Sequence, residues 1–343
     1  LRPNMIYPPK TVPPSNTVIE TCHNLGVQDN TLLQLGGGIN NLVYRCGEEG
    51  KQQWVIKSYP SLKPGTRDRM RAETEFLRYT EMVAPGLTPK IKHIDLINRC
   101  LVLECINGIP FSNELLTNHA INTAKRFFLN INEDLENARS IITLDAAEAF
   151  PDLNDHLDNI HQRINMMSTE HLTSEFRTNA LAMISNFQLN LEKLRESLLF
   201  QIDQGSLKAK IDRSQYCVSA SDFGFHNAVW TKTGVRFIDF EFSGWDDPAK
   251  AIADFLLQPQ IPIPKKSQIK ILKVLQKTNL LVYERTQAIM PILRLKWACI
   301  VMSILNPERL NKMQRVNPDI QVSNLIKARF ETSKQLVGLF NYG

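Results

Sequence analysis

The first hundred residues alternate short apolar runs with polar or glycine-containing turns, a pattern typical of antiparallel β-strands. The runs rich in β-branched and aromatic residues fall at 32–47, where three glycines divide two strands, and at 51–59, 93–97 and 100–106. A helix is predicted from about Thr17. The order strand, glycine turn, strand, polar turn and strand predicts an antiparallel meander.

A different periodicity appears between these strands and again after them. The segment 67–83 has apolar residues at the spacing of an amphipathic helix, namely Met70, Phe76, Leu77 and Met82. NGIP at 107–110 has the composition of a linker. Beyond it, helical patterns dominate, at 121–132, 153–168 and 178–202 and again toward the end of the chain.

This order of elements predicts an α+β fold with two lobes of unequal size. We expect a proline-rich, extended arm over residues 1–16, a small antiparallel β N-lobe over 17–106 and a larger, mainly helical C-lobe over 107–343. A length of 343 residues is compatible with two cores.

Composition narrows the class only a little. The chain is 43% hydrophobic and 22% charged, as in ordinary globular proteins, and its net charge of +5 makes no case for nucleic acid. Its six cysteines are scattered without a C-x-x-C pair, which argues against a zinc site or disulfide framework and favours the reducing cytoplasm. We see no apolar run of membrane-spanning length and predict no membrane partner.

The most informative pattern lies between Ser219 and Asp254. After Asn227 the run AVW, the turn TKTG and the run VRFI predict a β-hairpin. A turn centred near residues 232–233 brings Asn227 beside Asp239 at the open end, and Asp222 lies on the loop that enters the same end. Carboxylate and amide oxygens together make a site suited to Mg²⁺.

Two patterns in the predicted N-lobe add chemistry. Gly36, Gly37 and Gly38 allow backbone N–H groups to approach a polyphosphate closely, although a tight hairpin turn needs glycine for conformational reasons alone. Lys57 follows three apolar residues in a predicted strand, either as a solvated edge lysine or as a cation directed at a neighbour. Glu73 and Glu75 on the following helix face different directions, so only one of them can reach it.

In combination these motifs resemble the protein kinase-like phosphotransferases, and within them the aminoglycoside phosphotransferase and choline kinase-like branch. The resemblance rests on L-G-G-G-I-N-N-L-V-Y-R, on V-I-K, on the D-x-x-x-x-N spacing from Asp222 to Asn227, and on I-D-F-E followed by G-W-D-D-P. It covers residues 30–110 and 215–255 well and the remaining helices loosely.

The resemblance implies a role for each matched residue. It implies Asp222 as the catalytic base, Asn227 and Asp239 as Mg²⁺ ligands, and Lys57 as the contact to the α- and β-phosphates of ATP. It implies that Lys57 pairs with a helix glutamate, for which Glu73 matches the E-x-x-x-L pattern and Glu75 stays open. The remaining nucleotide contacts would come from the glycine loop with Asn41 and from backbone groups of Glu104 to Ile106.

Ala220 stands where this family usually has a histidine that braces the loop, and Ala251 stands where it often has an acid. From the resemblance we expect transfer of the ATP γ-phosphate to a hydroxyl of a small molecule, such as a sugar, an amino alcohol or an aminoglycoside-like compound. A catalytically weak, nucleotide-binding regulatory protein of the same fold is the alternative, and a kinase-like scaffold without nucleotide is a third.

Other charged positions have ordinary explanations. His226, next to Asn227, is expected to be a hydrogen-bonded loop residue rather than a metal ligand. Asp246 or Asp247 is expected to cap a helix before Pro248. Lysines at helical spacing indicate a solvated helix face, with a phosphate-rich partner as the alternative; they are Lys266, Lys270, Lys273 and Lys277. Arg294, Lys296 and Trp297 either border the substrate cleft or belong to the core.

Overall fold

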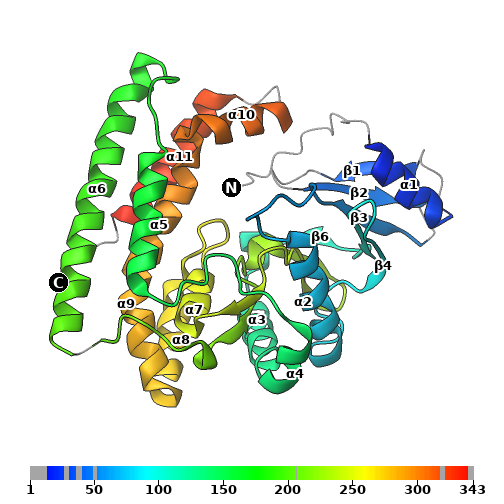
Figure 1. The fold of residues 1–343 in the computed structure, drawn as a ribbon, viewed down its shortest axis with the longest axis horizontal. Helices are drawn as coiled ribbons and strands as arrows, with labels where there is room; N and C mark the ends of the chain where they lie inside the picture. The colour runs from blue at the N-terminus through cyan, green and yellow to red at the C-terminus, as the bar shows by residue number, and fades with distance from the viewer. Residues whose placement is uncertain are drawn as a thin grey trace. The chain divides into compact units, whose positions relative to one another are not determined.

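The N-terminal part folds around a five-stranded antiparallel sheet (Figure 1). The structure is a computed structural model that describes residues 14–26, 31–35, 41–48, 52–205, 207–316 and 321–338. Strand order in this sheet is β1-β2-β3-β5-β4. The strands are β1 (Leu33–Leu35), β2 (Leu42–Cys46), β3 (Trp54–Ser58), β4 (Ile91–Asp95) and β5 (Cys100–Glu104). The meander predicted from the turns is therefore confirmed.

Two helices pack on this sheet. They are α1 (Asn16–Asn24) and α2 (Arg69–Val83). Asp68 caps α2 by accepting a hydrogen bond from the backbone N–H of Arg71, which would otherwise lack a partner at the helix start. Phe76 and Leu77 are buried as their spacing predicts. Met82 is 58% exposed, so this one position of the predicted apolar face does not belong to the core.

The hairpin predicted from TKTG is present and joins a short third strand. The strands are β6 (Ile109–Pro110), β8 (Ala228–Thr231) and β9 (Gly234–Phe237), in the order β6-β8-β9. Thr231 pairs with Gly234, so residues 232 and 233 form the turn. The segment 107–110 is more than the predicted linker, because β6 pairs with β8. Its Gly108 lies so close to the backbone of Trp230 that a Cβ atom there would stand 2.4 Å from a carbonyl oxygen.

Further elements complete the fold. Helix α3 (Asn118–Asn130) contacts β9, and α4 (Leu135–Ile141) contacts β7 (Cys217–Ser219), which pairs with β10 (Gly244–Asp246). The helical part contains α5 (Leu153–Asn165), α6 (Ser174–Asp203), α7 (Pro248–Leu257), α8 (Lys265–Thr278), α9 (Leu280–Val301), α10 (Pro307–Val316) and α11 (Val322–Val337). One apolar core runs through this part; among its fully buried members are Leu157, Phe187 and Leu293. The predicted α+β fold, with an antiparallel sheet followed by a mainly helical part, is confirmed.

Close packing groups the chain into two units. One unit comprises Arg2–Ala147 with Cys217–Trp245, and the other comprises Glu148–Tyr216 with Asp246–Gly343. The hairpin belongs to the same unit as the N-terminal sheet: β8 pairs with β6, which follows that sheet in the chain, and the backbone N–H of Phe237 donates to the carbonyl of Leu87. The proposed functional boundary near residue 106 stays a prediction, and most of the predicted arm, residues 1–13, lies outside the described residues.

One helical segment is longer and more apolar than expected. Leu280–Leu305, which is α9 with the 3₁₀ turn that follows, has 26 residues and enough hydropathy to cross a membrane by length and composition. This corrects the expectation that no apolar run reaches that length. Because 67% of its most apolar window is buried inside the protein, the segment has the character of a core helix.

Candidate active site

Lys57 is the centre of a buried ionic cluster. It lies on the central strand β3, is 6% exposed, and its Nζ donates to both carboxylate oxygens of Glu73, at 2.8 and 2.6 Å. The same Nζ lies 2.7 Å from Oδ1 of Asp239. Burial by itself would lower the pKa of Lys57, but the two carboxylates outweigh it and hold the pKa above its usual range. Lys57 therefore carries its charge at all physiological pH values.

The helix partner of Lys57 is Glu73. Its carboxylate is fully buried and also accepts hydrogen bonds from the Tyr59 hydroxyl and from the backbone N–H of Phe240. Glu75 points elsewhere and binds Arg71 and Thr143. Burial and the nearby Glu73 raise the pKa of Tyr59 well above its usual value, so Tyr59 stays a donor. The open choice between Glu73 and Glu75 is thus settled for the Lys57 pair.

The hairpin brings Asn227 close to Asp239, as the spacing of the two residues about the turn predicts. The backbone N–H of Ile238 donates to the carbonyl of Asn227 at 2.9 Å, which places Asp239 one residue beyond this pair. The Asn227 amide donates to the Asp222 carbonyl at 3.0 Å and lies 3.3 Å from its carboxylate. Asp239 has a φ of 70°, a left-handed conformation that is uncommon for a residue other than glycine.

Two phenylalanines anchor the acidic loops, and the motif analysis did not single them out. Phe223, directly after Asp222, packs against the rings of Phe127 and Phe237, with centroids 5.4 and 4.9 Å apart. Phe240, directly after Asp239, packs against Phe76 at 4.7 Å. The sequence contains a signal for these anchors, because a phenylalanine directly follows each of the two aspartates. These rings fix the backbone that carries the two carboxylates.

A second buried contact ties Asn41 to the same segment. The Asn41 amide nitrogen donates to the carboxylate of Glu241, and both side chains are buried. The Asn41 Oδ1 atom is buried without a hydrogen-bond partner in the described part of the chain. Gly36, Gly37 and Gly38 lie outside the described residues, so the predicted phosphate loop stays a prediction.

At the end of β5 the side chain of Glu104 has a structural partner. Arg236 donates to both of its carboxylate oxygens, at 2.6 and 2.7 Å, and these hydrogen bonds lower the pKa of Glu104. The backbone N–H of Glu104 donates to the carbonyl oxygen of Lys90 at 2.8 Å. The predicted adenine contact through backbone groups of Glu104 to Ile106 stays a prediction; Cys105 and Ile106 are half-buried.

The loop that holds Asp222 is braced without a histidine at position 220. Ala220 is buried, and Ser219 Oγ accepts from the backbone N–H of Ser221, whose φ is 62°. His226 contacts the acid from the other side, with its Nε2 3.1 Å from Asp222 Oδ1. Its Nδ1 is buried and has no hydrogen-bond partner among the residues that the structure describes. The expectation of a hydrogen-bonded loop histidine agrees with this geometry.

The oxygen donors at the hairpin fit a magnesium ion. Among the described residues no group of three or more His, Cys, Asp or Glu forms a metal cage. Mg²⁺ does not need one, because it is usually held by one or two protein oxygens together with waters and substrate phosphates. Asp239, whose side chain is 37% exposed, and the Asn227 amide oxygen are donors of this kind.

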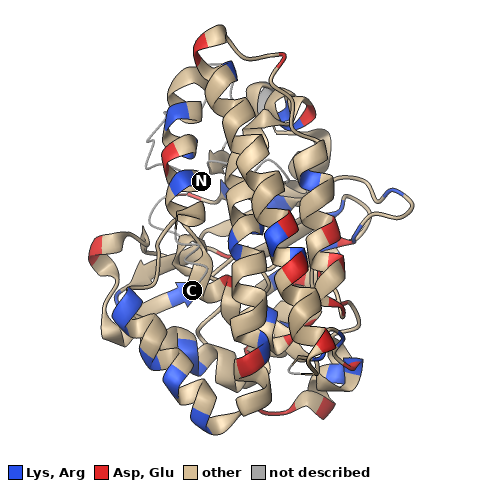
Figure 2. Ribbon diagram, turned by 90° about the vertical axis from the view of Figure 1, so that its left-hand side faces the viewer, with Lys and Arg blue, Asp and Glu red and all other residues tan. Residues whose placement is uncertain are grey.

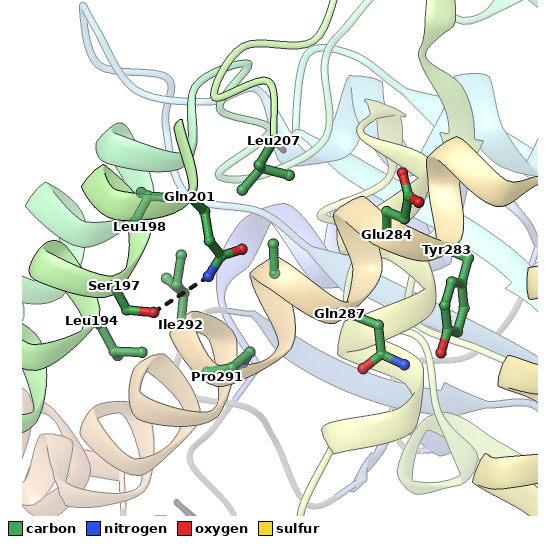
Figure 3. Close-up of a pocket in the computed structure, with 11 residues that line it drawn as sticks. Leu194, Ser197, Leu198, Gln201, Leu207, Tyr283, Glu284, Gln287, Pro291 and Ile292 are labelled. Carbon is green, nitrogen blue, oxygen red and sulfur yellow. Dashed lines mark hydrogen bonds between the residues drawn. The ribbon is translucent and has the colours of Figure 1, made fainter. Parts of the chain in front are cut away.

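Two sets of residues outside the predicted site have structural roles. Asp247 caps α7, as predicted, by accepting from the N–H of Ala249, whereas Asp246 pairs with Lys250. Lys296 is buried beside Asp254, which identifies it as part of the core rather than of a cleft. A hollow of about 440 Å³ between α6 and α9 (Figure 3) is lined by no predicted site residue.

The antiparallel sheet with its Lys–Glu pair, followed by the D-x-x-x-x-N hairpin and helices, defines a protein kinase-like phosphotransferase. The model of the APH phosphotransferase enzyme family matches residues 31–288, well over half of the chain. The chain therefore belongs to this family. No curated protein matches it at significant similarity.

Solved structures share the fold at low sequence identity. A choline kinase from Cryptosporidium parvum Iowa II is 14% identical with a TM-score of 0.54, over 93% of this chain and 94% of that one. Spectinomycin phosphotransferase in complex with ADP and spectinomycin is 11% identical with a TM-score of 0.60, over 95% and 99%. A choline/ethanolamine kinase family protein from Mesorhizobium loti is 15% identical with a TM-score of 0.51, over 91% and 89%.

Proposed function

We propose that the chain is an ATP- and Mg²⁺-dependent phosphotransferase that moves the γ-phosphoryl group to a hydroxyl of a small molecule. The observation that carries this proposal is the position of Lys57, whose Nζ bridges Glu73 and Asp239. A buried lysine between two carboxylates is held rigidly enough to contact phosphates. Structural neighbours named as a choline kinase and a spectinomycin phosphotransferase favour a small acceptor, such as an amino alcohol, a sugar or an aminoglycoside-like compound.

In this proposal Asp222 is the base. The acceptor O–H donates to the Asp222 carboxylate, the acceptor oxygen forms a bond to the γ-phosphorus, and the bond from that phosphorus to the β-phosphate oxygen breaks. The proton passes to Asp222 and ADP leaves. Phosphoryl transfer depends on positioning and charge neutralisation, so a fixed carboxylate and a fixed ammonium group suffice as side-chain machinery.

Asn227 and Asp239 would hold Mg²⁺. When bound, the ion neutralises negative charge on the phosphates. Lys57 would contact the α- and β-phosphates, while Glu73 and Tyr59 keep its ammonium group in place. The glycines 36–38 with Asn41, and the backbone from Glu104 to Ile106, would complete the nucleotide site. Six free thiols favour the cytoplasm as the compartment.

One observation favours the alternative of a catalytically weak, nucleotide-binding regulatory protein. Ala220 offers the Asp222 loop no polar side chain, so the orientation of Asp222 depends on His226 and Asn227. A scaffold without nucleotide is less favoured, because such a protein has no need to bury a lysine between two acids.

The test combines nucleotide binding with turnover in wild type, Asp222→Asn and Asp239→Ala. We expect Mg²⁺ and ATP together to raise the melting temperature of wild type and Asp222→Asn, and to raise that of Asp239→Ala much less. We expect ADP release with at least one compound of a hydroxyl-acceptor panel in wild type, reduced at least 100-fold in Asp222→Asn.

Each outcome separates two candidates. Binding without acceptor-dependent ADP release would support the regulatory protein and reject the enzyme. If Mg²⁺ and ATP do not change the melting temperature of wild type, both nucleotide-binding candidates would be rejected and the scaffold without nucleotide would be supported. An unchanged response in Asp239→Ala would reject the metal assignment while leaving the transferase open.

A further inference from the structure

Helix α8 is the most one-sidedly charged segment of the chain. It contains five lysines and no acidic residue, and the surrounding stretch 255–283 also lacks aspartate and glutamate. Its charge of +5 equals the net charge of the whole protein. Figure 2 shows where Lys and Arg (blue) and Asp and Glu (red) fall along the ribbon; α8 has blue positions and no red one.

The lysines gather on one face of the helix. At 3.6 residues per turn, Lys266, Lys270, Lys273 and Lys277 fall within an arc of about 60°. All four are exposed, and within the described residues none of them forms an ion pair. Among the described residues, therefore, no acid relieves their mutual repulsion.

Aliphatic side chains flank this lysine face. Ile269 lies on one side of the arc and Val274 on the other, and they are 46% and 47% exposed. The helix has no fully buried residue. At the turn into α9, Leu280 and Leu281 are 53% and 73% exposed. The four lysines, Ile269 and Val274 thus share one surface of α8, and Leu280 and Leu281 follow directly after its C-terminal end. We call these eight residues the α8 surface.

We propose that the α8 surface binds anionic lipid membranes. Lysines attract the negative headgroups, while exposed aliphatic side chains gain by entering the boundary between headgroups and acyl chains. This inference is independent of the proposed phosphotransferase activity. It departs from the expectation of no membrane partner, because the exposure of the aliphatic residues cannot be seen in the sequence.

A lipid surface fits these residues better than a nucleic acid does. Proteins that bind nucleic acid nonspecifically combine positive charge with aromatic rings for base stacking and with arginine. The stretch 265–281 contains neither arginine nor an aromatic residue. Exposed leucine, isoleucine and valine gain nothing from a phosphate backbone, whereas they are the residues that an interfacial helix inserts.

The experiment measures co-sedimentation of the whole chain with vesicles. We expect binding to vesicles of phosphatidylglycerol mixed with phosphatidylcholine, little binding to pure phosphatidylcholine, and a decrease as salt rises. The quadruple variant Lys266→Gln, Lys270→Gln, Lys273→Gln and Lys277→Gln should bind at least tenfold more weakly. Its control removes four exposed lysines elsewhere, Lys63, Lys208, Lys232 and Lys312, and should stay within about twofold of wild type.

A second pair of variants tests the aliphatic part. Leu280→Ser with Leu281→Ser should weaken vesicle binding several-fold, while Leu189→Ser with Leu199→Ser, on the exposed face of α6, should not. Equal losses in the two lysine variants would show attraction by net charge alone and overturn the proposal. The chain could instead bind duplex DNA as tightly as the anionic vesicles, through the same lysines. That result would overturn the proposal and identify nucleic acid as the partner. Absence of binding to anionic vesicles at low salt would also overturn it.

Discussion

The contact between His226 and Asp222 makes a prediction at the level of one side chain. His226 is the neighbour that approaches the Asp222 carboxylate opposite Asn227, at 3.1 Å. On the proposed function, we expect His226→Ala to lower kcat by about 10- to 100-fold, the effect of losing a hydrogen bond to a charged group of about 1.5–3 kcal/mol. KM for ATP and the ATP-induced rise in melting temperature should change little, because His226 is a positioning residue.

The conservative variant separates positioning from folding. His226→Gln keeps a donor at a similar distance and should recover part of kcat. Steady-state kinetics of both variants provide the measurement. Equal kcat in wild type and His226→Ala would exclude a positioning role, and a fall in ATP-induced stabilisation would indicate damage to the nucleotide site instead.

At the same scale, the sequence identifies some site residues better than others. Spacing alone placed Asn227 near Asp239, because a two-residue turn determines the register of the hairpin. Spacing also limited the Lys57 partner to Glu73 or Glu75 but could not choose, since the choice depends on which helix face meets the sheet. Contacts between distant segments, such as Asn41 with Glu241, have no local signal in one sequence.

Helix α7 shows how a single element depends on buried charge. Its Lys250 is 1% exposed and lies 2.7 Å from Asp246 and 3.3 Å from Asp254. Burial raises the pKa of Asp246 to about 6, even though Lys250 acts in the opposite direction. We expect Lys250→Met to lower the free energy of unfolding by about 3–5 kcal/mol, because it leaves the buried Asp246 without its cation, while Asp254 keeps Lys296.

Urea denaturation measures this loss. Lys270→Met on the exposed face of α8 is the matched control and should change stability by less than about 0.5 kcal/mol. Adding Asp246→Asn to Lys250→Met should recover part of the loss, since it removes one unpaired charge. A loss below about 1 kcal/mol in Lys250→Met would mean that the buried pair contributes no more than an exposed one.

Over the whole molecule, local signals predict the order of the elements, whereas the grouping of these elements in space depends on pairings between distant segments. Turn residues and periodicity are local signals, and they located the sheet, α2 and the hairpin. The grouping of 217–245 with the N-terminal sheet depends on pairings between segments more than a hundred residues apart, such as β6 with β8. Apolar periodicity also could not show that most of Leu280–Leu305 is buried.

Acid sensitivity of the folded chain follows from His156 on α5. Its side chain is 1% exposed, and within the described residues neither ring nitrogen has a hydrogen-bond partner. Burial lowers its pKa well below the usual value, and the nearby Lys296, Lys250 and Arg285 add to this, while Asp254 opposes them. The unfolded chain therefore binds a proton near pH 6.5 that the folded chain does not bind until lower pH.

The sign of the effect follows from this difference. Above about pH 6.5 both states have a neutral His156, and its contribution to stability is complete; as pH falls below that value, the unfolded state is favoured by up to about 1.4 kcal/mol per pH unit. We expect His156→Leu to reduce the slope of unfolding free energy against pH between 6.5 and 5, relative to wild type. His161→Leu, which alters an exposed histidine on the same helix, should leave the slope unchanged. Urea titrations at several pH values give these slopes, and equal slopes for wild type and His156→Leu would show that other groups cause the acid sensitivity.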